Sequence, residues 1–291
     1  MLVAECLELC LAKGYAVPQD LIGALRRTCL EAIADAVAIP ARQALGLCLG
    51  RLGDPRIRSL RDPGAYVEVP AGDYVYGDKN EPIRIETAFR IARYPTTNGQ
   101  YLAFIEDGGY ANPDWWSDEG WAWRQQAGVT EPGYWQERRW NGPNQPVVGV
   151  SFWEAEACCR WAGGRLPRER EWEAAARSPE GYQYPWGDKW EDGICNSREV
   201  GLEVTSAVGI FPRSRQAQLG LDDLTGSVGQ WSCNEEAERA AVEPGVLRGG
   251  FFSVGIDFLH TWLRWGGTGW GAGKSLQLPL RPGRAPPALT H

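Results

Sequence analysis

From Tyr66 to the C-terminus the chain consists of short apolar and polar runs that are broken repeatedly by glycine, proline, asparagine and aspartate. The 291 residues include 36 glycines and 20 prolines, which leave few stretches long enough for a regular helix. The 15 tryptophans can bury a large aromatic area without regular elements. This pattern predicts a loop-rich α+β fold that is held together mainly by aromatic packing.

Three helices are expected within this part of the chain. One spans Thr97–Glu106, with Thr97 or Asn98 as its cap, and a second spans Trp153–Ala162. A third begins near Pro167, where a proline at the start and acidic residues in the first turn favour a helix. The aromatic run that follows the first helix, residues 112–142, is expected to be a long loop pinned to the body by its rings, and a sugar-binding platform is the alternative.

Residues 1–60 are expected to form a small helical segment in front of the main domain, residues 61–291. Pro18 and Pro40 stand at first-turn positions of successive helices, and the last apolar run ends at Gly53. No chemistry-bearing motif falls in this segment. It is therefore either a packing unit or the end of a larger helical region.

The charge and hydrophobicity of the chain exclude several classes of partner. A net charge of −7 provides no basic face for a phosphate backbone, so nucleic acid is not expected to bind. No run approaches the roughly 18 apolar residues that a membrane span requires. The N-terminus lacks the basic region of a signal peptide, which predicts a cytoplasmic location. The protein is expected to be a monomer.

Eight cysteines and two histidines limit the metal chemistry that the chain can support. Half of the cysteines fall on apolar faces of expected helices and are interpreted as buried thiols: Cys6, Cys10, Cys29 and Cys48. The others lack the Cys-x-x-Cys spacing of a zinc site: Cys158, Cys159, Cys195 and Cys233. The histidines are His260 and His291. Neither a zinc site nor a histidine-bound metal is expected.

Five motifs resemble those of formylglycine-generating enzymes and their sulfatase-modifying-factor relatives, in the same order. They are YVEVPAGDYVYGD, RIARYPTTNGQYLAFIEDGGY, QPVVGVSFWEAEACCRWAGGRLPREREWEAAAR, YPWGDKWEDGICNS and GLDDLTGSVGQW. The resemblance covers the chain from about Tyr66 onward. It implies a C-type lectin fold of the formylglycine-generating-enzyme subtype, preceded by the small helical segment.

The resemblance also implies where catalytic residues would lie. Catalytic relatives oxidise a substrate cysteine with a copper-binding cysteine pair placed after an Arg-Gly-Gly turn, which is Arg248 to Gly250 here. No cysteine follows Cys233, and thiolates are both the metal ligands and the redox groups of that reaction. A second branch uses iron bound by three histidines, more than this chain has. On these grounds the sequence predicts a protein that is not an enzyme.

The C-terminal tail VLRGGFFSVGIDFLHTWLRWGGTGWG resembles the diversified tails of variable proteins from diversity-generating retroelements. Residues 250–280 are then the variable region, whose aromatic side chains would form an exposed, ligand-binding patch. The candidate binding residues are Phe252, Ser253, Val254, Gly255, Ile256, Phe258, His260, Trp262, Trp265, Thr268 and Trp270. Burial in the core is the alternative for the three tryptophans.

Three functions follow from these patterns. The first is a non-catalytic protein that binds an unknown macromolecular ligand, and this ligand is expected to be another protein. The second is an oxidase of the formylglycine-generating type that acts on substrate cysteines. The third is a structural display module attached to a signalling or phage-encoded protein. The missing cysteine pair favours the first over the second.

No cofactor is required by this interpretation, but the resemblance implies a structural calcium site near GLDDLTGSVGQW. The matching positions are Asp223, Gly226, Val228 and Gln230. Gln230 stands where a glutamate is usual, and the loss of that charge is expected to weaken calcium binding. A hydrogen-bonded turn without an ion is the alternative.

Overall fold

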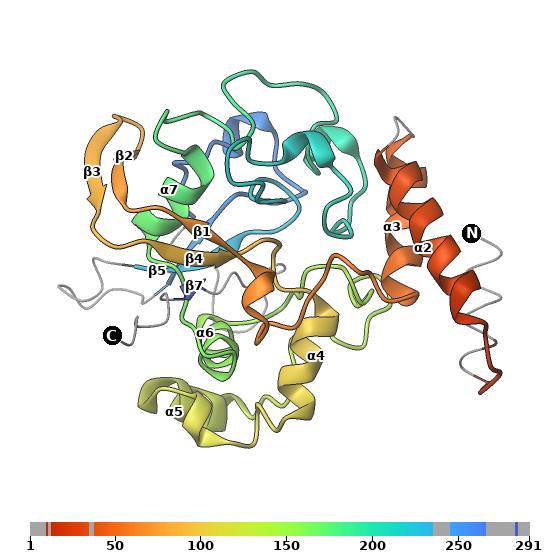
Figure 1. Cartoon of the computed structure of the whole chain (residues 1–291). Coiled ribbons are helices and arrows are strands. Elements are labelled where there is room, and N and C mark those ends of the chain that lie inside the picture. Colours follow the sequence, from red (N-terminus) through yellow and green to blue (C-terminus); the bar gives the residue numbers. More distant parts are fainter. Residues whose placement is uncertain (1–9, 11–12, 35–37, 235–244, 266–282, 285–291) are drawn as a thin grey trace, which may run out of the picture.

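The computed structural model describes residues 10, 13–34, 38–234, 245–265 and 283–284 (Figure 1). The helices are α2 (Gln19–Ala34), α3 (Ile39–Arg51), α4 (Asn98–Glu106), α5 (Asp118–Ala127), α6 (Phe152–Trp161) and α7 (Glu169–Arg177). The strands are β1 (Tyr66–Val69), β2 (Gly72–Tyr76), β3 (Glu81–Ile85), β4 (Phe89–Ala92), β5 (Gln230–Cys233), β6 (Gly245–Arg248) and β7 (Gly283–Arg284). This mixture of helices and strands confirms the predicted α+β class.

The strands form small antiparallel sheets with the orders β1-β4-β7, β2-β3 and β5-β6. In the first sheet Val69 pairs with Phe89, and both side chains are buried. The neighbouring pair, Glu68 and Arg90, lies on the other face, where the two charged groups approach to 3.7 Å. The alternation of apolar and charged residues therefore places one face of this sheet on the core.

Helices α4 and α6 begin at local capping boxes. The Thr97 hydroxyl accepts a hydrogen bond from the Gln100 backbone, and the Gln100 side chain accepts one from the Thr97 backbone. Ser151 and Glu154 form the same reciprocal pair at the start of α6. Because each box depends only on residues three apart, the sequence locates both helix starts to within one residue.

Helix α5 lies inside the aromatic run that was predicted to be a loop. Ser117 caps it by accepting a hydrogen bond from the Gly120 backbone, and Gly128 ends it in a left-handed conformation with φ of 65°. Trp121 and Trp123 on this helix pack against the core as the sequence predicted for this run. The cap and stop residues were present in the sequence, but the aromatic residues obscured them.

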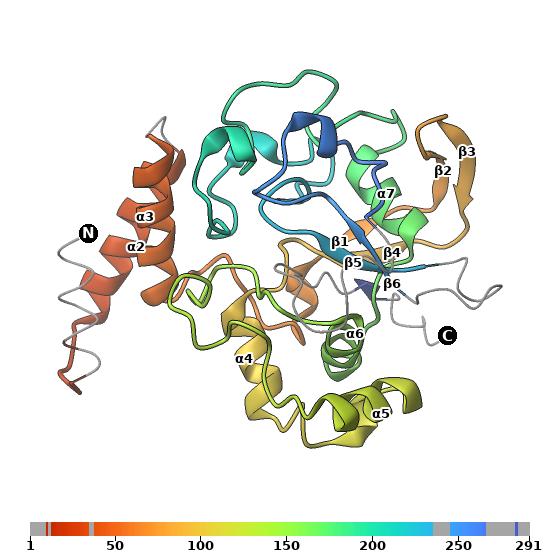
Figure 2. The ribbon, with the colours of Figure 1, turned by 180° about the vertical axis from the view of Figure 1, so that it is seen from behind.

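Helices α2 and α3 lie side by side at one edge of the molecule, and the β2–β3 hairpin lies at the opposite edge (Figures 1 and 2). Leu49 of α3 and Leu52, which caps its C-terminal end, are buried in one cluster with Ile210 and Phe211 of the body. The N-terminal helices therefore share a core with the rest of the chain. None of the described helices is long and apolar enough to cross a membrane.

Candidate functional site

A group of buried charges lies beneath the C-terminal tail. Arg248 ends β6 with no exposed surface, and its guanidinium donates to Glu173 of α7 and, at 3.0 Å, to the Thr261 carbonyl. Arg264 donates to both carboxylate oxygens of Glu169, at 2.7 and 2.9 Å. These ion pairs hold the end of β6 and the tail on α7, because Glu173 receives Arg248 from the Arg-Gly-Gly turn and Glu169 receives Arg264 from the segment after it.

Arg177 connects the buried charges to the tail residue Trp262. Its guanidinium lies 5.2 Å from the centre of the Trp262 ring system and donates to Glu173 at 3.0 Å. The same guanidinium also donates hydrogen bonds to the carbonyl oxygens of Gly77 and Gly181, at 2.8 and 3.0 Å. Arg177 thus uses its donors on protein groups and fixes the position of Trp262.

A stack of four aromatic rings extends from Trp262. The ring centres of Trp262 and His260 are 4.5 Å apart and nearly parallel, and Tyr184 lies 5.0 Å from His260. Trp186 continues the stack at 5.0 Å from Tyr184. Burial lowers the pKa of His260, which favours the neutral imidazole within the stack.

A hollow of about 410 Å³ opens beside Trp262. It is lined by Asp78, Asn80, Arg177, Gly181, Gln183, Asp188 and Trp262. Asp188 accepts a hydrogen bond from the Gln183 backbone, and neither Asp78 nor Asp188 forms an ion pair within the described part of the chain. The hollow therefore has two carboxylates at its rim, and the one arginine among its lining residues is already hydrogen-bonded to protein groups. Such a hollow suits a positively charged or hydrogen-bond-donating small molecule.

The hollow contains one of the residues predicted from the sequence, Trp262, and its neighbour His260 lies in the stack. Asp78, Asn80 and Asp188 were not predicted. Asp78 and Asn80 occupy the turn between β2 and β3, and Asp188 follows the YPWG motif. Asp78 and Asp188 entered the sequence analysis only within motifs of the family resemblance, and nothing in their spacing indicates that they meet Trp262.

The other predicted binding residues that the structure describes differ widely in exposure. Phe252 is only 9% exposed and lies 5.8 Å from Trp140, ring centre to ring centre. Val254 packs against the cluster around Cys195. The remaining described positions divide into a buried Gly255, half-buried Ile256, His260, Trp262 and Trp265, and exposed Ser253 and Phe258. Thr268 and Trp270 lie outside the described residues.

The burial of tail residues such as Phe252 has two causes, the turn of the chain after β6 and the packing of the following loop on the body. Gly249 and Gly250 have φ values of 88° and 70°, which turn the chain sharply after β6. The following residues form a loop with one short 3₁₀ helix, Ile256–Phe258, that lies against the body instead of forming solvent-facing strands. Among the described residues 251–265, Phe258 is the large apolar side chain that is mainly exposed, at 51%.

The segment predicted to bind calcium is a closely hydrogen-bonded turn. The Asp223 carboxylate accepts from the Gly209 backbone at 2.6 Å, and the buried Gln230 amide donates to the Asp223 carbonyl at 2.8 Å. Gln230 also accepts from the Trp172 indole at 3.0 Å. Two of the predicted ligands, the Asp223 carboxylate and the Gln230 side chain, are therefore engaged in hydrogen bonds within the protein. Val228 is buried, and Gly226 has a φ of 77°.

The cysteines of the body are buried, or half-buried at Cys233, and are poor redox or metal-binding groups. Burial raises the pKa of Cys158 and Cys195 far above the ordinary thiol value. Burial also raises the pKa of Cys233 to about 11. Thiols in such surroundings stay protonated at neutral pH. No cluster of three or more potential metal ligands occurs among the residues that the structure describes.

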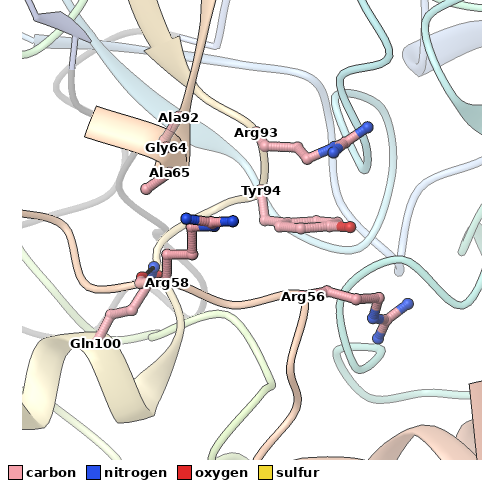
Figure 3. A pocket seen from close by; sticks show the side chains of 8 residues that line it. All are labelled: Arg56, Arg58, Gly64, Ala65, Ala92, Arg93, Tyr94 and Gln100. Atoms are coloured by element: carbon pink, nitrogen blue, oxygen red, sulfur yellow. Dashed lines mark hydrogen bonds between the residues drawn. The ribbon is translucent and has the colours of Figure 1, made fainter. Parts of the chain in front are cut away.

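A second, smaller hollow of about 130 Å³ lies beside Arg56, Arg58, Arg93 and Tyr94 (Figure 3). The side chains of Arg56 and Tyr94 extend in the same direction, and Arg56 pairs with both oxygens of Asp54, at 2.9 and 2.6 Å. Burial raises the pKa of Tyr94 to about 12. These groups are engaged in internal contacts and connect the N-terminal segment to the body.

The sequence of residues 54–269 matches the model of the sulfatase-modifying factor enzyme 1-like domain. The chain belongs to this family. The predicted resemblance is therefore confirmed at the family level. The structural similarity to Treponema denticola variable protein 1 (TM-score 0.53, 16% identity, covering 76% of this chain and 95% of that protein) supports the fold alone.

Enzymes are found among the similar proteins. Hercynine oxygenase of Mycolicibacterium thermoresistibile is 34% identical over 210 residues, which cover 60% of this chain and 46% of that protein. The formylglycine-generating enzyme of Mycobacterium tuberculosis is 29% identical over 237 residues, which cover 61% of this chain and 76% of that protein. The match spans less than half the length of the hercynine oxygenase.

These similarities correct two predictions. The chain was predicted to be a non-catalytic ligand-binding protein and not an enzyme, but relatives at 34 to 39% identity carry the name of an enzyme, hercynine oxygenase, which contradicts both predictions. The error came from treating two absences, of the cysteine pair and of a third histidine, as the loss of all catalysis. The family includes an enzyme named for a different substrate, so that pair is not a sufficient criterion.

Proposed function

We propose that this chain is the substrate-binding domain of an oxidase of the sulfatase-modifying factor enzyme 1-like family, and that the substrate is a small, positively charged molecule. The similarity to proteins named hercynine oxygenase supports the reaction class. The activity belongs to the whole protein, since those relatives are about twice as long as the matched region.

The hollow beside Trp262 is the observation that carries the substrate class. Asp78 and Asp188 place negative charge at its rim without described cationic partners. Arg177 does not compete with a substrate for them, because its own donors are held by Glu173 and by backbone carbonyl groups. A cationic group would gain electrostatic attraction to the carboxylates at the rim and contact with the aromatic side chain of Trp262.

The residues of this chain bind and orient the substrate in this proposal, and they do not supply the oxidising group. The buried thiols have raised pKa values, and the chain has two histidines where a histidine-bound iron needs three. We therefore assign the oxidising centre to protein outside these 291 residues, either in the same polypeptide or in a partner.

Calorimetric titration with hercynine tests the substrate class. Asp78→Asn and Asp188→Asn should each weaken binding by about tenfold or more, because each change removes the attraction between a carboxylate and the positive charge of the ligand. Glu106→Gln is the matched control, because Glu106 is an exposed acid on α4, far from the hollow. Equal affinity in all four proteins, or no binding of hercynine and of a simple trimethylammonium betaine, would contradict the proposal.

Oxidation of substrate cysteines is the second candidate reaction, and the relatives named formylglycine-generating enzyme support it. The absence of any cysteine after Cys233 opposes it. Incubation with a Cys-x-Pro-x-Arg peptide and copper, followed by mass spectrometry, separates the two candidates. Conversion of the peptide cysteine would favour this reaction over the hercynine-type oxidation.

The C-type lectin subtype of the fold is also part of this proposal. The small antiparallel sheets, the long loops and the similarity to Treponema denticola variable protein 1 support it. An experimental structure in which β1, β4 and β7 are not neighbours would argue against it.

A further inference from the structure

We propose that Cys29 and Cys48 are an oxidation site, at which a small peroxide closes a disulfide between α2 and α3. The two sulfur atoms face each other across the helix pair at 3.7 Å. Both side chains are buried, with exposed fractions of 5% and 8%. Among the described cysteines, this is the pair whose sulfur atoms are in contact.

The helix pair already brings the two sulfur atoms close to bonding distance. A disulfide bond is about 2.05 Å long, so the sulfur atoms must approach by less than 2 Å, on the order of a side-chain rotation. Cys158 and Cys159 are neighbours in the sequence but point in different directions from α6, since successive helical residues are rotated by about 100°. Proximity in sequence therefore does not select the reactive pair, whereas helix packing does.

The burial of the pair determines which oxidant can react. Two S–H bonds break and one S–S bond forms, and the two electrons and two protons reduce one peroxide to two waters. Glutathione disulfide would need a bulky mixed disulfide as the intermediate, for which a buried site between packed helices has no room. Oxidation by a small peroxide proceeds through a sulfenic acid, an intermediate that adds only one hydroxyl group to one of the two sulfur atoms.

The reaction should be slow at neutral pH and faster in alkaline solution. Burial, together with the neighbouring Cys48, raises the pKa of Cys29 to about 11. At neutral pH the reactive thiolate is then a small fraction of the total Cys29. As long as the pH is below that pKa, raising the pH by one unit increases this fraction roughly tenfold. The same burial protects the finished disulfide, because a reducing thiol must reach the sulfur atoms.

The cross-link would lock α2 to α3 and, through α3, to the body. Leu49 of α3 and its C-cap residue Leu52 are already packed with Ile210 and Phe211. The cross-linked cysteines are 19 residues apart, and closing a loop of that length restricts the unfolded chain. We expect the Tm of the full chain to rise by roughly 5–10 °C on oxidation.

Peptide mapping without reduction, combined with thermal unfolding, tests the site. After hydrogen peroxide treatment of the full chain, the peptides of Cys29 and Cys48 should appear joined, two hydrogens lighter than their sum, and the Tm should rise. Cys29→Ala and Cys48→Ala should each abolish both effects. Cys195→Ala, at a buried cysteine without a sulfur neighbour, should retain both.

Two results would overturn the proposal. One is oxidation of either cysteine to sulfinic acid without the joined peptide. The other is a rise in Tm that survives in Cys29→Ala. Where a variant fails to fold, the mass of the wild-type peptides still decides between cross-linked and separate cysteines.

Discussion

At the scale of single residues, Phe252 and Phe258 show how differently two neighbouring aromatic side chains of the tail behave. Phe252 is 9% exposed and packs on Trp140, whereas Phe258 is 51% exposed. We expect Phe252→Ser to lower the free energy of unfolding by about 3–5 kcal/mol and Phe258→Ser by less than about 1 kcal/mol, as measured by urea denaturation. Equal effects of the two changes would contradict this view of the tail.

His260 should make the stability of the protein depend on pH. Burial lowers its pKa, partly opposed by the nearby Asp257, so the unfolded chain takes up a proton before the folded one. The neutral form therefore contributes stability above the ordinary histidine pKa of about 6.5, and this contribution is lost as the pH falls through the lower folded-state pKa.

The variant His260→Gln tests this dependence by thermal unfolding. Between neutral and mildly acidic pH, the wild-type chain should lose more of its Tm than His260→Gln does, because glutamine does not titrate. Parallel curves for the two proteins would show that His260 does not carry this pH dependence. Asp114→Asn, at an exposed acid distant in sequence from the stack, serves as the control.

At the scale of elements, α3 is fitted to the body more closely than α2 is. A side-chain carbon added at Gly50 would collide with the amide of Asn144, which is fixed because it donates to the Gly46 carbonyl at 2.8 Å. At Gly23 of α2 the nearest atom would be the tip of Arg27, at 3.7 Å, an ordinary contact.

Alanine at these two glycines should therefore have opposite effects. Gly50→Ala should destabilise the protein by about 1–3 kcal/mol through overpacking. Gly23→Ala should stabilise it by about 0.5–1 kcal/mol, because alanine favours a helix. Chemical denaturation of both variants decides the matter, and stabilisation by both would show that α3 is not in close contact with the body.

At the scale of the whole molecule, the N-terminal helices and the body should unfold together. The family match begins at residue 54, yet Leu49 and Leu52 are buried with Ile210 and Phe211. Calorimetry of the full chain should show one cooperative transition, and removal of residues 1–53 should lower the Tm, since each buried apolar side chain contributes about 1.5–3 kcal/mol. A truncated chain with an unchanged Tm would mean that the body is stable alone.

The sequence alone determined the α+β class, the family and the starts of α4 and α6. These features depend on residues close together in the chain, such as the reciprocal hydrogen bonds of Thr97 and Gln100. It also contained the cap and stop of α5, although these signals were outweighed by the surrounding tryptophans. The absence of a cysteine after Cys233 and of a third histidine was wrongly extended to the absence of all catalysis.

Only the tertiary structure decided which tail residues are buried and what lies beside Trp262. Phe252 is covered by Trp140, and the hollow combines Asp78, Asp188 and Trp262, which come from three distant parts of the chain. Burial and the approach of charges depend on these long-range contacts, and the local spacing of residues in the tail does not encode them.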